Sequence, residues 1–267
     1  MADSHTPPNA RAGRALPLDW ERTPWWIIIL ILAGTVAVMI IFTSAEYTNI
    51  ILLLSSGIYF TLYVTFFAYA LALLIGLVAG LMRVSHNLIL YTLSTLYVEI
   101  IRGIPLLVQI LYFFYVIAPA IANALPEPYA SLFRREEHIG IVALAIGYGA
   151  YLAETYRAGI EAIPRGQMEA ARSLGMSYLQ AMRYVILPQA IRIILPPLGN
   201  DLVAMLKDSA LTSAISVKEL TLWTRQRSAA TFQPLEHWTI AAVLYLTMTI
   251  GLSFLVRYIE RKFAIPK

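Results

Sequence analysis

The sequence predicts an all-α integral membrane protein, a bundle of transmembrane helices. Of its 267 residues, 59% are hydrophobic and 13% are charged, and the mean hydropathy is +0.67. A soluble domain is nearer half apolar and about a quarter charged, so composition alone indicates the bilayer. Uncharged runs long enough to cross a membrane also recur along the chain. The length suits one compact helical membrane domain.

The charged and reactive residues argue against several other classes of protein. The net charge is +4, but the basic residues are scattered between apolar runs, which suits topology-setting loops better than a nucleic-acid surface. Cysteine is absent, which excludes disulfides and thiol chemistry. The histidines show no metal-ligand spacing, so we expect no metal site. They are His5, His86, His138 and His237.

The first apolar run follows a polar tail. Residues 1–24 contain prolines and charges, which predicts a cytoplasmic N-terminal tail. Residues 25–42 are 18 uncharged residues, which is roughly 27 Å of helix at about 1.5 Å per residue. A cleaved signal peptide is the alternative, but its apolar region is usually only about 7–15 residues long. We therefore expect an extra N-terminal transmembrane helix over residues 25–42.

The next uncharged run, residues 47–82, is too long for one perpendicular helix. A polar Ser-Ser-Gly triplet at residues 55–57 divides it, so we expect an external surface segment followed by a span over residues 58–82. Gly76 and Gly80 form a GxxxG pair in this span, which would let a second helix approach closely. The alternative is that two small residues coincide by chance in an apolar helix.

Three further apolar regions cover residues 88–118, 139–156 and 238–256. Between the last two, residues 185–206 contain three prolines and a polar Asn-Asp pair. We expect a broken helix here that lines a cavity, because a break facing lipid would leave backbone groups unsatisfied. The total is six spans.

The distribution of basic residues predicts the orientation. With the N-terminus inside, the inside segments carry twelve arginines and lysines and the outside segments carry five. The positive-inside rule therefore favours cytoplasmic N- and C-termini. The same topology puts the charged segment over residues 160–184 in the cytoplasm.

Residues 160–184 have apolar positions at near-helical spacing, with charged residues on the other side. Pro164 begins one helix, and a Gly-Met-Ser break from Gly175 separates it from a second, which gives two short amphipathic helices. With the small Ala170 and Ala171 at its centre, such a helix could lie in a partner's groove. The alternative from the residues alone is an interfacial helix that rests on lipid headgroups.

Residues 169–188 read EAARSLGMSYLQAMRYVILP, and this pattern resembles the coupling loop of ABC-importer permeases. In that family, short cytoplasmic helices dock into a groove of a separate ATPase subunit. Val185 departs mildly from the family, where isoleucine is more usual. The resemblance implies a type I permease fold over residues 57–263, with five core spans in addition to the N-terminal one. It also implies a set of ATPase-coupling residues. They are Arg165, Gly166, Glu169, Ala170, Ala171, Gly175, Leu187 and Pro188.

Four further motifs resemble the histidine, glutamine and glutamate subfamily, which carries polar amino acids. They read YVEIIRGIPLLVQ at residues 97–109, LPQAIR at 187–192, PPLGN at 196–200 and LKDS at 206–209. Many members begin at the equivalent of Gly57, so the helix over residues 25–42 is a departure whose role the resemblance does not explain.

Charged residues at bilayer depth suggest the substrate pathway. An ionised side chain there costs a few kcal/mol, so it needs a partner or a wet cavity. Glu99 and Arg102 are i,i+3 neighbours that could neutralise each other, either as part of the pathway or only as a fixed salt bridge that holds a helix break. A zwitterionic amino acid needs an acceptor for its ammonium and donors for its carboxylate. The expected pathway residues are Glu99, Arg102, Gln109, Asn200, Asp201, Lys207, Asp208 and Ser209.

Residues 209–237 are polar, and in the family the equivalent segment covers the external mouth and faces a substrate-binding protein. Lys218, Arg225 and Arg227 give this segment positive charge, which could meet an acidic patch or could simply be solvated.

The resemblance as a whole implies a permease subunit of a polar-amino-acid importer in a bacterial inner membrane. Its partners would be a second permease, identical or similar, two ATPase subunits that bind ATP and Mg²⁺, and a periplasmic or lipid-anchored amino-acid-binding protein. We expect no cofactor in this chain. A secondary transporter driven by an ion gradient is the alternative, but it would leave the coupling segment without a purpose. The sequence contains no GxxxxGK[ST], HExxH or GxSxG motif, so we do not expect an enzyme.

Overall fold

The computed structural model describes residues 25, 29, 32, 34 and 45–263. The expected N-terminal tail lies outside the described residues, and so does nearly all of the expected extra helix over residues 25–42. The chain divides into two units, Met1–Thr48 and Asn49–Lys267, and the second contains the whole of the expected permease domain.

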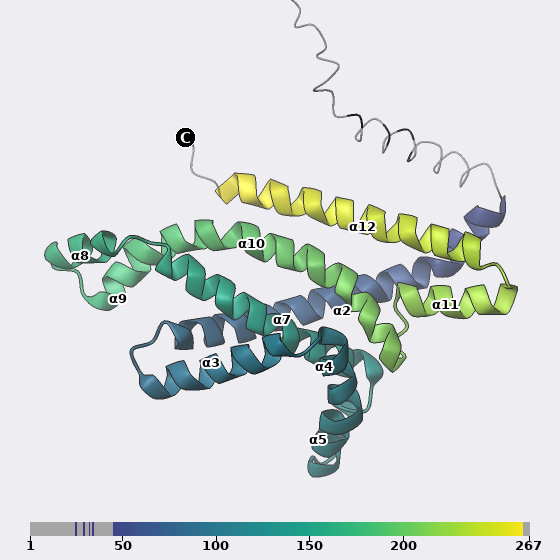
Figure 1. Cartoon of the computed structure of the whole chain (residues 1–267), viewed down its shortest axis with the longest axis horizontal. Coiled ribbons are helices and arrows are strands. Elements are labelled where there is room, and N and C mark those ends of the chain that lie inside the picture. The colour runs from purple at the N-terminus through teal and green to yellow at the C-terminus, as the bar shows by residue number, and fades with distance from the viewer. Residues whose placement is uncertain (1–24, 26–28, 30–31, 33, 35–44, 264–267) are drawn as a thin grey trace, which may run out of the picture. The chain divides into compact units, whose positions relative to one another are not determined.

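The described residues form helices without a strand, so the predicted all-α class is confirmed (Figure 1). In chain order the elements are α2 (Ala45–Arg83), α3 (Leu88–Gly103), α4 (Leu106–Tyr112), the π-helix η1 (Phe113–Ile117), α5 (Ala118–Ala124), α6 (Tyr129–Leu132), α7 (Glu136–Glu161), α8 (Arg165–Ser173), α9 (Tyr178–Ala181), the π-helix η2 (Met182–Ile186), α10 (Leu187–Asp208), the 3₁₀-helix η3 (Ser209–Ile215), α11 (Leu220–Thr231) and α12 (Pro234–Phe263).

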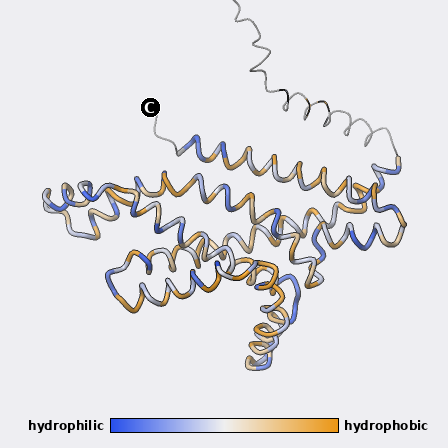
Figure 2. Tube along the Cα trace, in the orientation of Figure 1, coloured by the Kyte–Doolittle hydropathy of each residue, from blue (hydrophilic) through white to orange (hydrophobic). Residues whose placement is uncertain are grey.

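Four of the described segments are long and apolar enough to cross a membrane. They are α2, the run α4–η1–α5, α7 and α12. The 22-residue α10 packs against both α7 and α12. Hydrophilic residues gather at α8 and α9, away from the most apolar helices (Figure 2).

The expected division of the second apolar run is wrong, because α2 continues for 39 residues through the Ser-Ser-Gly triplet. Ser55 Oγ donates a hydrogen bond to the carbonyl of Leu52 at 2.7 Å, so the helix itself satisfies this hydroxyl. Gly57 is buried beside the start of α11, where a Cβ would lie 2.8 Å from Leu220 Cα. The triplet therefore marks a helix contact and not a break.

The apolar region over residues 88–118 is two helices and not one. The helix α3 ends at Gly103, and Ile104 is extended with φ −108° and ψ 133°. The residue before a proline avoids helical geometry, so Pro105 separates α3 from α4. Gln109 Nε2 then donates to the carbonyls of Ile101 and Ile104, each at 2.7 Å, and caps the end of α3.

The expected broken helix over residues 185–206 is also wrong, since α10 is a continuous α-helix that contains Pro196 and Pro197. Proline removes a helical hydrogen bond, but packing against neighbouring helices can hold the remaining turns in place. The neighbours α7 and α12 supply that packing. The irregular backbone lies earlier, in the π-helix η2, where the coupling segment meets α10.

The GxxxG pair in α2 does make a close helix contact, which decides between the two interpretations that the sequence left open. A Cβ on Gly76 would lie 2.5 Å from Leu152 Cβ, and one on Gly80 would lie 2.9 Å from the carbonyl oxygen of Ala153. The helix α7 therefore approaches α2 nearly to backbone contact. This seam borders the main hydrophobic core, in which α2 and α7 bury Ala68, Ala72 and Leu144.

Candidate functional site

The segment between α7 and α10 forms two short helices, α8 and α9, as the sequence predicts. Pro164 is the N-cap of α8. After α8, Met176 N donates to the carbonyl of Ala171 at 3.2 Å and Gly175 N to that of Arg172 at 3.0 Å. This pair of bonds is a Schellman motif, which needs a left-handed residue at its turn. Gly175 supplies it with a φ of +83°.

The second helix is fixed by its own cap. Ser177 Oγ accepts from Gln180 N at 3.3 Å, and Gln180 Oε1 accepts from Ser177 N at 2.8 Å, which is a complete capping box. The last turn of α9 runs directly into η2 and then α10. The two helices are therefore shaped by local hydrogen bonds that the sequence between Pro164 and Gln180 specifies by itself.

A buried cluster attaches this segment to α10. Ile163, just before α8, packs with Ile186, Ala190 and Ile194, and Met168 of α8 covers them. A displacement of α8 would therefore press on the first half of α10.

The other side of the segment is exposed and partly apolar. Leu174 has 82% of its surface exposed and Leu179 has 77%. The predicted apolar side thus divides in two, because Ala171 and Ala181 are buried while these leucines face outward. Of the residues expected to contact an ATPase, only Ala171 is buried on α8. Arg165, Gly166, Glu169 and Ala170 are exposed on α8, Gly175 is exposed at the turn, and Leu187 and Pro188 lie in the first turn of α10.

A second site lies between α7 and α10. Asp201 and Asp208 are seven residues apart on the continuous α10 and line one cavity of about 290 Å³ together with Tyr148 and Tyr151 of α7. Tyr148 Oη donates to Asp208 Oδ2 at 2.7 Å. The guanidinium of Arg102 lies 5.4 Å from the centre of the Tyr151 ring, within the range of a cation–π contact. The cavity thus has two carboxylates, two phenols and a cation beside one of the rings.

The structure separates the other expected pathway residues. Glu99 does not pair with Arg102. Its carboxylate lies 4.0 Å from Arg83, so the proposed i,i+3 neutralisation is not formed. Gln109 caps α3 and does not line the cavity. Ser209 is fully buried and donates to the carbonyl of Leu206 at 2.7 Å.

Asn200 and Lys207 are both exposed and share a face of α10, because the helix continues between them. They do not line the cavity of Asp201 and Asp208. Sequence reasoning missed Tyr148 and Tyr151, because neither side chain is charged and both sit in a largely apolar run. The i,i+7 spacing of the two aspartates was the available signal, and it would have been visible had a continuous helix been expected.

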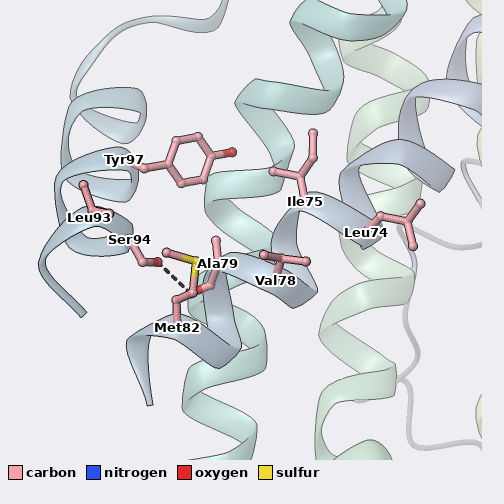
Figure 3. Close-up of a pocket in the computed structure, with 8 residues that line it drawn as sticks. All are labelled: Leu74, Ile75, Val78, Ala79, Met82, Leu93, Ser94 and Tyr97. Atoms are coloured by element: carbon pink, nitrogen blue, oxygen red, sulfur yellow. Dashed lines mark hydrogen bonds between the residues drawn. The ribbon is translucent and has the colours of Figure 1, made fainter. Parts of the chain in front are cut away.

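A larger cavity of about 430 Å³ between α2 and α3 offers a contrast (Figure 3). Its lining is almost wholly apolar, and its two hydroxyls are already used. Ser94 Oγ donates to the carbonyl of Ala79 at 2.6 Å and Tyr97 Oη to that of Ile146 at 2.6 Å. This cavity has no free polar group for a zwitterion.

The segment over residues 209–237 folds as η3 and α11 and is more buried than its polarity suggests. Glu219 is fully buried as the N-cap of α11 and accepts from Thr221 N and Leu222 N, each at 2.8 Å, and from Tyr245 Oη at 2.6 Å. Burial raises the pKa of Glu219, and these hydrogen bonds oppose the shift. Lys218 and Arg225 are exposed, and Arg227 lies over the Trp223 ring.

Within the described residues, no group of three or more His, Cys, Asp or Glu side chains could hold a metal ion.

Comparison with known proteins identifies the family. Residues 72–265 match the family described as binding-protein-dependent transport system inner membrane component. The chain belongs to this family. Membership favours a transporter that works with a binding protein over a secondary transporter driven by an ion gradient, and it agrees with the fold class predicted from the sequence.

Individual relatives cover most of the chain. The glutamine transport system permease protein GlnP of Escherichia coli is 36% identical over 213 residues, 80% of this chain and 94% of that protein. The probable glutamine ABC transporter permease protein GlnM of Bacillus subtilis is 37% identical over 206 residues, 77% of this chain and 91% of its own.

Solved structures give the same fold. A crystal structure of an amino acid ABC transporter with histidines has a TM-score of 0.71 and 40% identity, and the match covers 83% of this chain and 97% of that one. An inward-facing form of the MetNI methionine ABC transporter matches with a TM-score of 0.68 over 81% of this chain and 99% of its own, at 23% identity. The latter likeness supports the fold alone.

Proposed function

We propose that this chain is the permease subunit of an ABC importer for polar amino acids and has no catalytic activity of its own. ATP and Mg²⁺ would be bound by a partner ATPase. The observation that carries the proposal is the coupling segment: α8 and α9 are shaped by their own caps, expose Leu174 and Leu179, and pack on α10 through a buried cluster. Such a segment suits a helix that docks in a partner's groove.

The coupling residues would divide into three roles. Exposed Glu169 would face basic residues of the ATPase, and the small Ala170 would allow close approach. Gly175 would hold the turn that sets α8 against α9. Closure of two ATPases would draw the α8 helices of two permeases together, and the buried cluster around Ile163 would pass that movement to α10. Because α10 carries Asp201 and Asp208, the movement would open or close the cavity that they line.

The substrate class follows from that cavity. Two carboxylates can accept hydrogen bonds from an ammonium or guanidinium group, and Arg102 beside Tyr151 could pair with a substrate carboxylate. Charged residues at membrane depth that face a cavity between helices are typical of a substrate pathway. Besides the glutamine permeases, further relatives bear the names of permeases for arginine, nopaline, L-cystine and octopine, and all five substrates carry an α-ammonium or a guanidinium group.

The proposed assembly has two permeases, either identical or similar, above two ATPase subunits, in a bacterial inner membrane with both termini in the cytoplasm. An amino-acid-binding protein would deliver substrate at the opposite face, near η3 and α11, where Lys218 and Arg225 are exposed. The distribution of basic residues in the sequence supports this orientation.

The test is transport by the complete complex in proteoliposomes. We expect uptake of a radiolabelled amino acid to require ATP, a co-purified ATPase and the binding protein, and to continue when ionophores collapse ion gradients. Gly175→Val should lower both uptake and stimulated ATP hydrolysis at least tenfold, because a β-branched residue at φ +83° strains the turn. Gly251→Val is the matched control, since Gly251 also has open space around it but lies in α12. Uptake that follows an ion gradient without ATP would reject the proposal.

The substrate cavity is tested by binding to the solubilised complex. Asp201→Asn and Asp208→Asn should each weaken binding of a radiolabelled cationic or zwitterionic amino acid at least tenfold, because each removes a charge from the cavity. Glu127→Gln is the control, since Glu127 lies on an exposed loop and pairs with Arg134. Wild-type affinity in both aspartate variants would exclude this cavity as the binding site.

A further inference from the structure

A chain of ion pairs joins three helices at the end of α7 that leads into α8. Arg83, the last residue of α2, donates from Nη1 to Glu154 Oε2 of α7 at 2.6 Å, and its Nη2 lies 4.0 Å from Glu99 of α3. The other oxygen of Glu154 accepts from Arg157, which also donates to Glu161 Oε2 at 2.6 Å. The chain thus runs from α3, through the end of α2, along the last two turns of α7.

The centre of this chain is shielded from solvent. The Arg83 side chain is 10% exposed, whereas Arg134, which pairs with Glu127 in the loop before α6, is 59% exposed. Exposed pairs contribute little to stability, but removing one partner of a buried pair leaves an unpaired charge. Both Arg83 Nε and Arg157 Nε are buried without a hydrogen-bond partner among the described residues.

The helices beneath the network are already in close contact. Gly80 lies three residues before Arg83, and a Cβ there would be 2.7 Å from Tyr156 Cβ. At this seam the two backbones cannot come closer, so α2 and α7 have little freedom except to slide or rotate along the seam. The pairs between Arg83 and Glu154 oppose that sliding, because a shift of one turn would separate their charges.

The far end of the network reaches the coupling segment. Glu161 is the last residue of α7, and only Ala162, Ile163 and Pro164 separate it from α8. Glu161 and Arg165, the first residue of α8, line the same cavity of about 490 Å³ together with Met168. A movement of α8 would therefore act first on the end of α7, where the ion pairs begin.

We propose that Arg83 is a positioning residue that transmits movement of α8 to α2 and α3 through Glu154, Arg157 and Glu161. The inference rests on the proposed function and extends it. The buried cluster around Ile163 links α8 to α10, and the ion pairs link it to the other side of the bundle. Both helices beside the substrate cavity, α7 and α10, would then move together when the ATPase pulls on α8.

The experiment measures amino acid molecules transported per ATP hydrolysed by the complete complex in proteoliposomes. With Arg83→Gln, we expect ATP hydrolysis within about twofold of wild type and transport per ATP at least tenfold lower. Arg83→Lys should retain part of the coupling, because lysine keeps the charge but cannot contact two carboxylates in a fixed fork. Arg134→Gln is the matched control, and its ratio should equal that of wild type.

The inference would be overturned if transport per ATP hydrolysed in Arg83→Gln stayed at the wild-type value, including the case in which uptake and hydrolysis fall in the same proportion. If Arg83→Gln fails to assemble, Glu161→Gln decides instead, because Glu161 is half-exposed and its loss should not unfold the protein. Its ratio should fall at least threefold, and an unchanged ratio would overturn the inference. Failure of the wild-type complex to couple uptake to ATP would instead reject the proposed function itself.

Discussion

The two ends of α10 are built in opposite ways. At its N-terminal end lie α8 and α9 (Figure 1). These two helices are held by local caps and expose Leu174 and Leu179. At its C-terminal end, η3 and α11 bury Ile215, Leu220 and Leu222 and hydrogen-bond to helices far away in the sequence. The α8–α9 end is therefore shaped by hydrogen bonds within itself, whereas the η3–α11 end is held by hydrogen bonds to α2 and α12.

Side chains from two long helices, α2 and α12, form hydrogen bonds to the η3–α11 end. Thr61 Oγ1 of α2 accepts from Leu220 N at 3.1 Å, and Tyr245 Oη of α12 donates to Glu219 at 2.6 Å. Gly57 lets α2 approach the backbone of α11. The α8–α9 end has few such links outside its hydrophobic cluster. One hydrogen bond that joins α8 to α10 runs from Gln189 Nε2 to Gln167 Oε1, and its length of 3.5 Å makes it weak.

The difference indicates how one chain can combine an end that binds a partner, α8–α9, with an end that is held by its own helices, η3–α11. Exposed leucines next to well-capped short helices cost solubility in the isolated chain, so they are expected where a partner covers them. In the η3–α11 segment, the buried Glu219 carboxylate and the backbone at the start of α11 already have hydrogen-bond partners within the chain, so they need none from an ATPase. The proposed ATPase should therefore bind at the first end, and the second should set the shape of the permease.

The largest expected effect comes from placing charge on the α8–α9 end. Leu174→Asp combined with Leu179→Asp should leave the isolated permease as stable as wild type to within about 0.5 kcal/mol, because both side chains are exposed. Affinity for the partner ATPase should fall about 100-fold or more, since two carboxylates would be buried without partners. Co-purification with the ATPase and thermal unfolding in detergent measure the two quantities.

A single substitution at the other end is the matched control. Leu235→Asp alters a similarly exposed leucine in the first turn of α12 and should leave ATPase association unchanged. Equal loss of ATPase binding in both variants would mean that exposed charge harms assembly in general, and the contrast between the ends would disappear.

The second prediction removes the carboxylate that holds the η3–α11 end. Glu219→Gln keeps the shape but leaves only one acceptor oxygen for three donors, so an amide N–H must face another donor. We expect the free energy of unfolding to fall by about 3 kcal/mol, with lost hydrogen bonds at about 1–3 kcal/mol each. Thermal unfolding in detergent measures this, and a change below about 0.5 kcal/mol would show that the buried carboxylate does not hold this end.

The pH dependence of the free energy of unfolding, measured for wild type and Glu219→Gln, tests whether the buried carboxyl group causes this difference in stability. Because burial raises the pKa of Glu219 above its ordinary value of 4.5, its contribution to stability is fully present below that value and is lost as the pH rises through the raised pKa. The stability advantage of wild type over Glu219→Gln should therefore narrow as the pH increases. An advantage that widens with pH would contradict the raised pKa.

The sequence could predict those features whose cause is local. Pro164, Gly175 and Ser177 set the limits of α8 and α9 through caps and a left-handed turn, and such signals need no knowledge of the rest of the fold. The Gly76–Gly80 pair showed where a neighbouring helix could approach, because small residues at helical spacing leave room, but the sequence did not distinguish this from a chance coincidence.

Features that depend on distant partners could not be predicted in this way. The Ser-Ser-Gly triplet resembles a break until Leu220 is seen beside Gly57. Glu99 resembles a partner for Arg102 until the end of α2 brings Arg83 near it. Tyr148 carries no charge, and only its hydrogen bond to Asp208, sixty residues away in the sequence, connects it with the candidate cavity.

The smallest expected effects come from a pair of glycine substitutions that compare the two ends directly. Gly57→Ala should cost about 1–2 kcal/mol, because its Cβ would meet the backbone of α11. Gly166→Ala lies in α8 with nothing within 4 Å, so it should stabilise the isolated permease by about 0.5 kcal/mol through a better helix former. Thermal unfolding of both variants in detergent shows whether each substitution raises or lowers the free energy of unfolding. If Gly166→Ala also weakens ATPase binding while it stabilises the free chain, the open space around α8 is reserved for a partner. If Gly166→Ala destabilises the free chain, this face of α8 already packs against other residues of the chain. The proposed contrast between a partner-binding α8–α9 end and an internally held η3–α11 end would then be wrong.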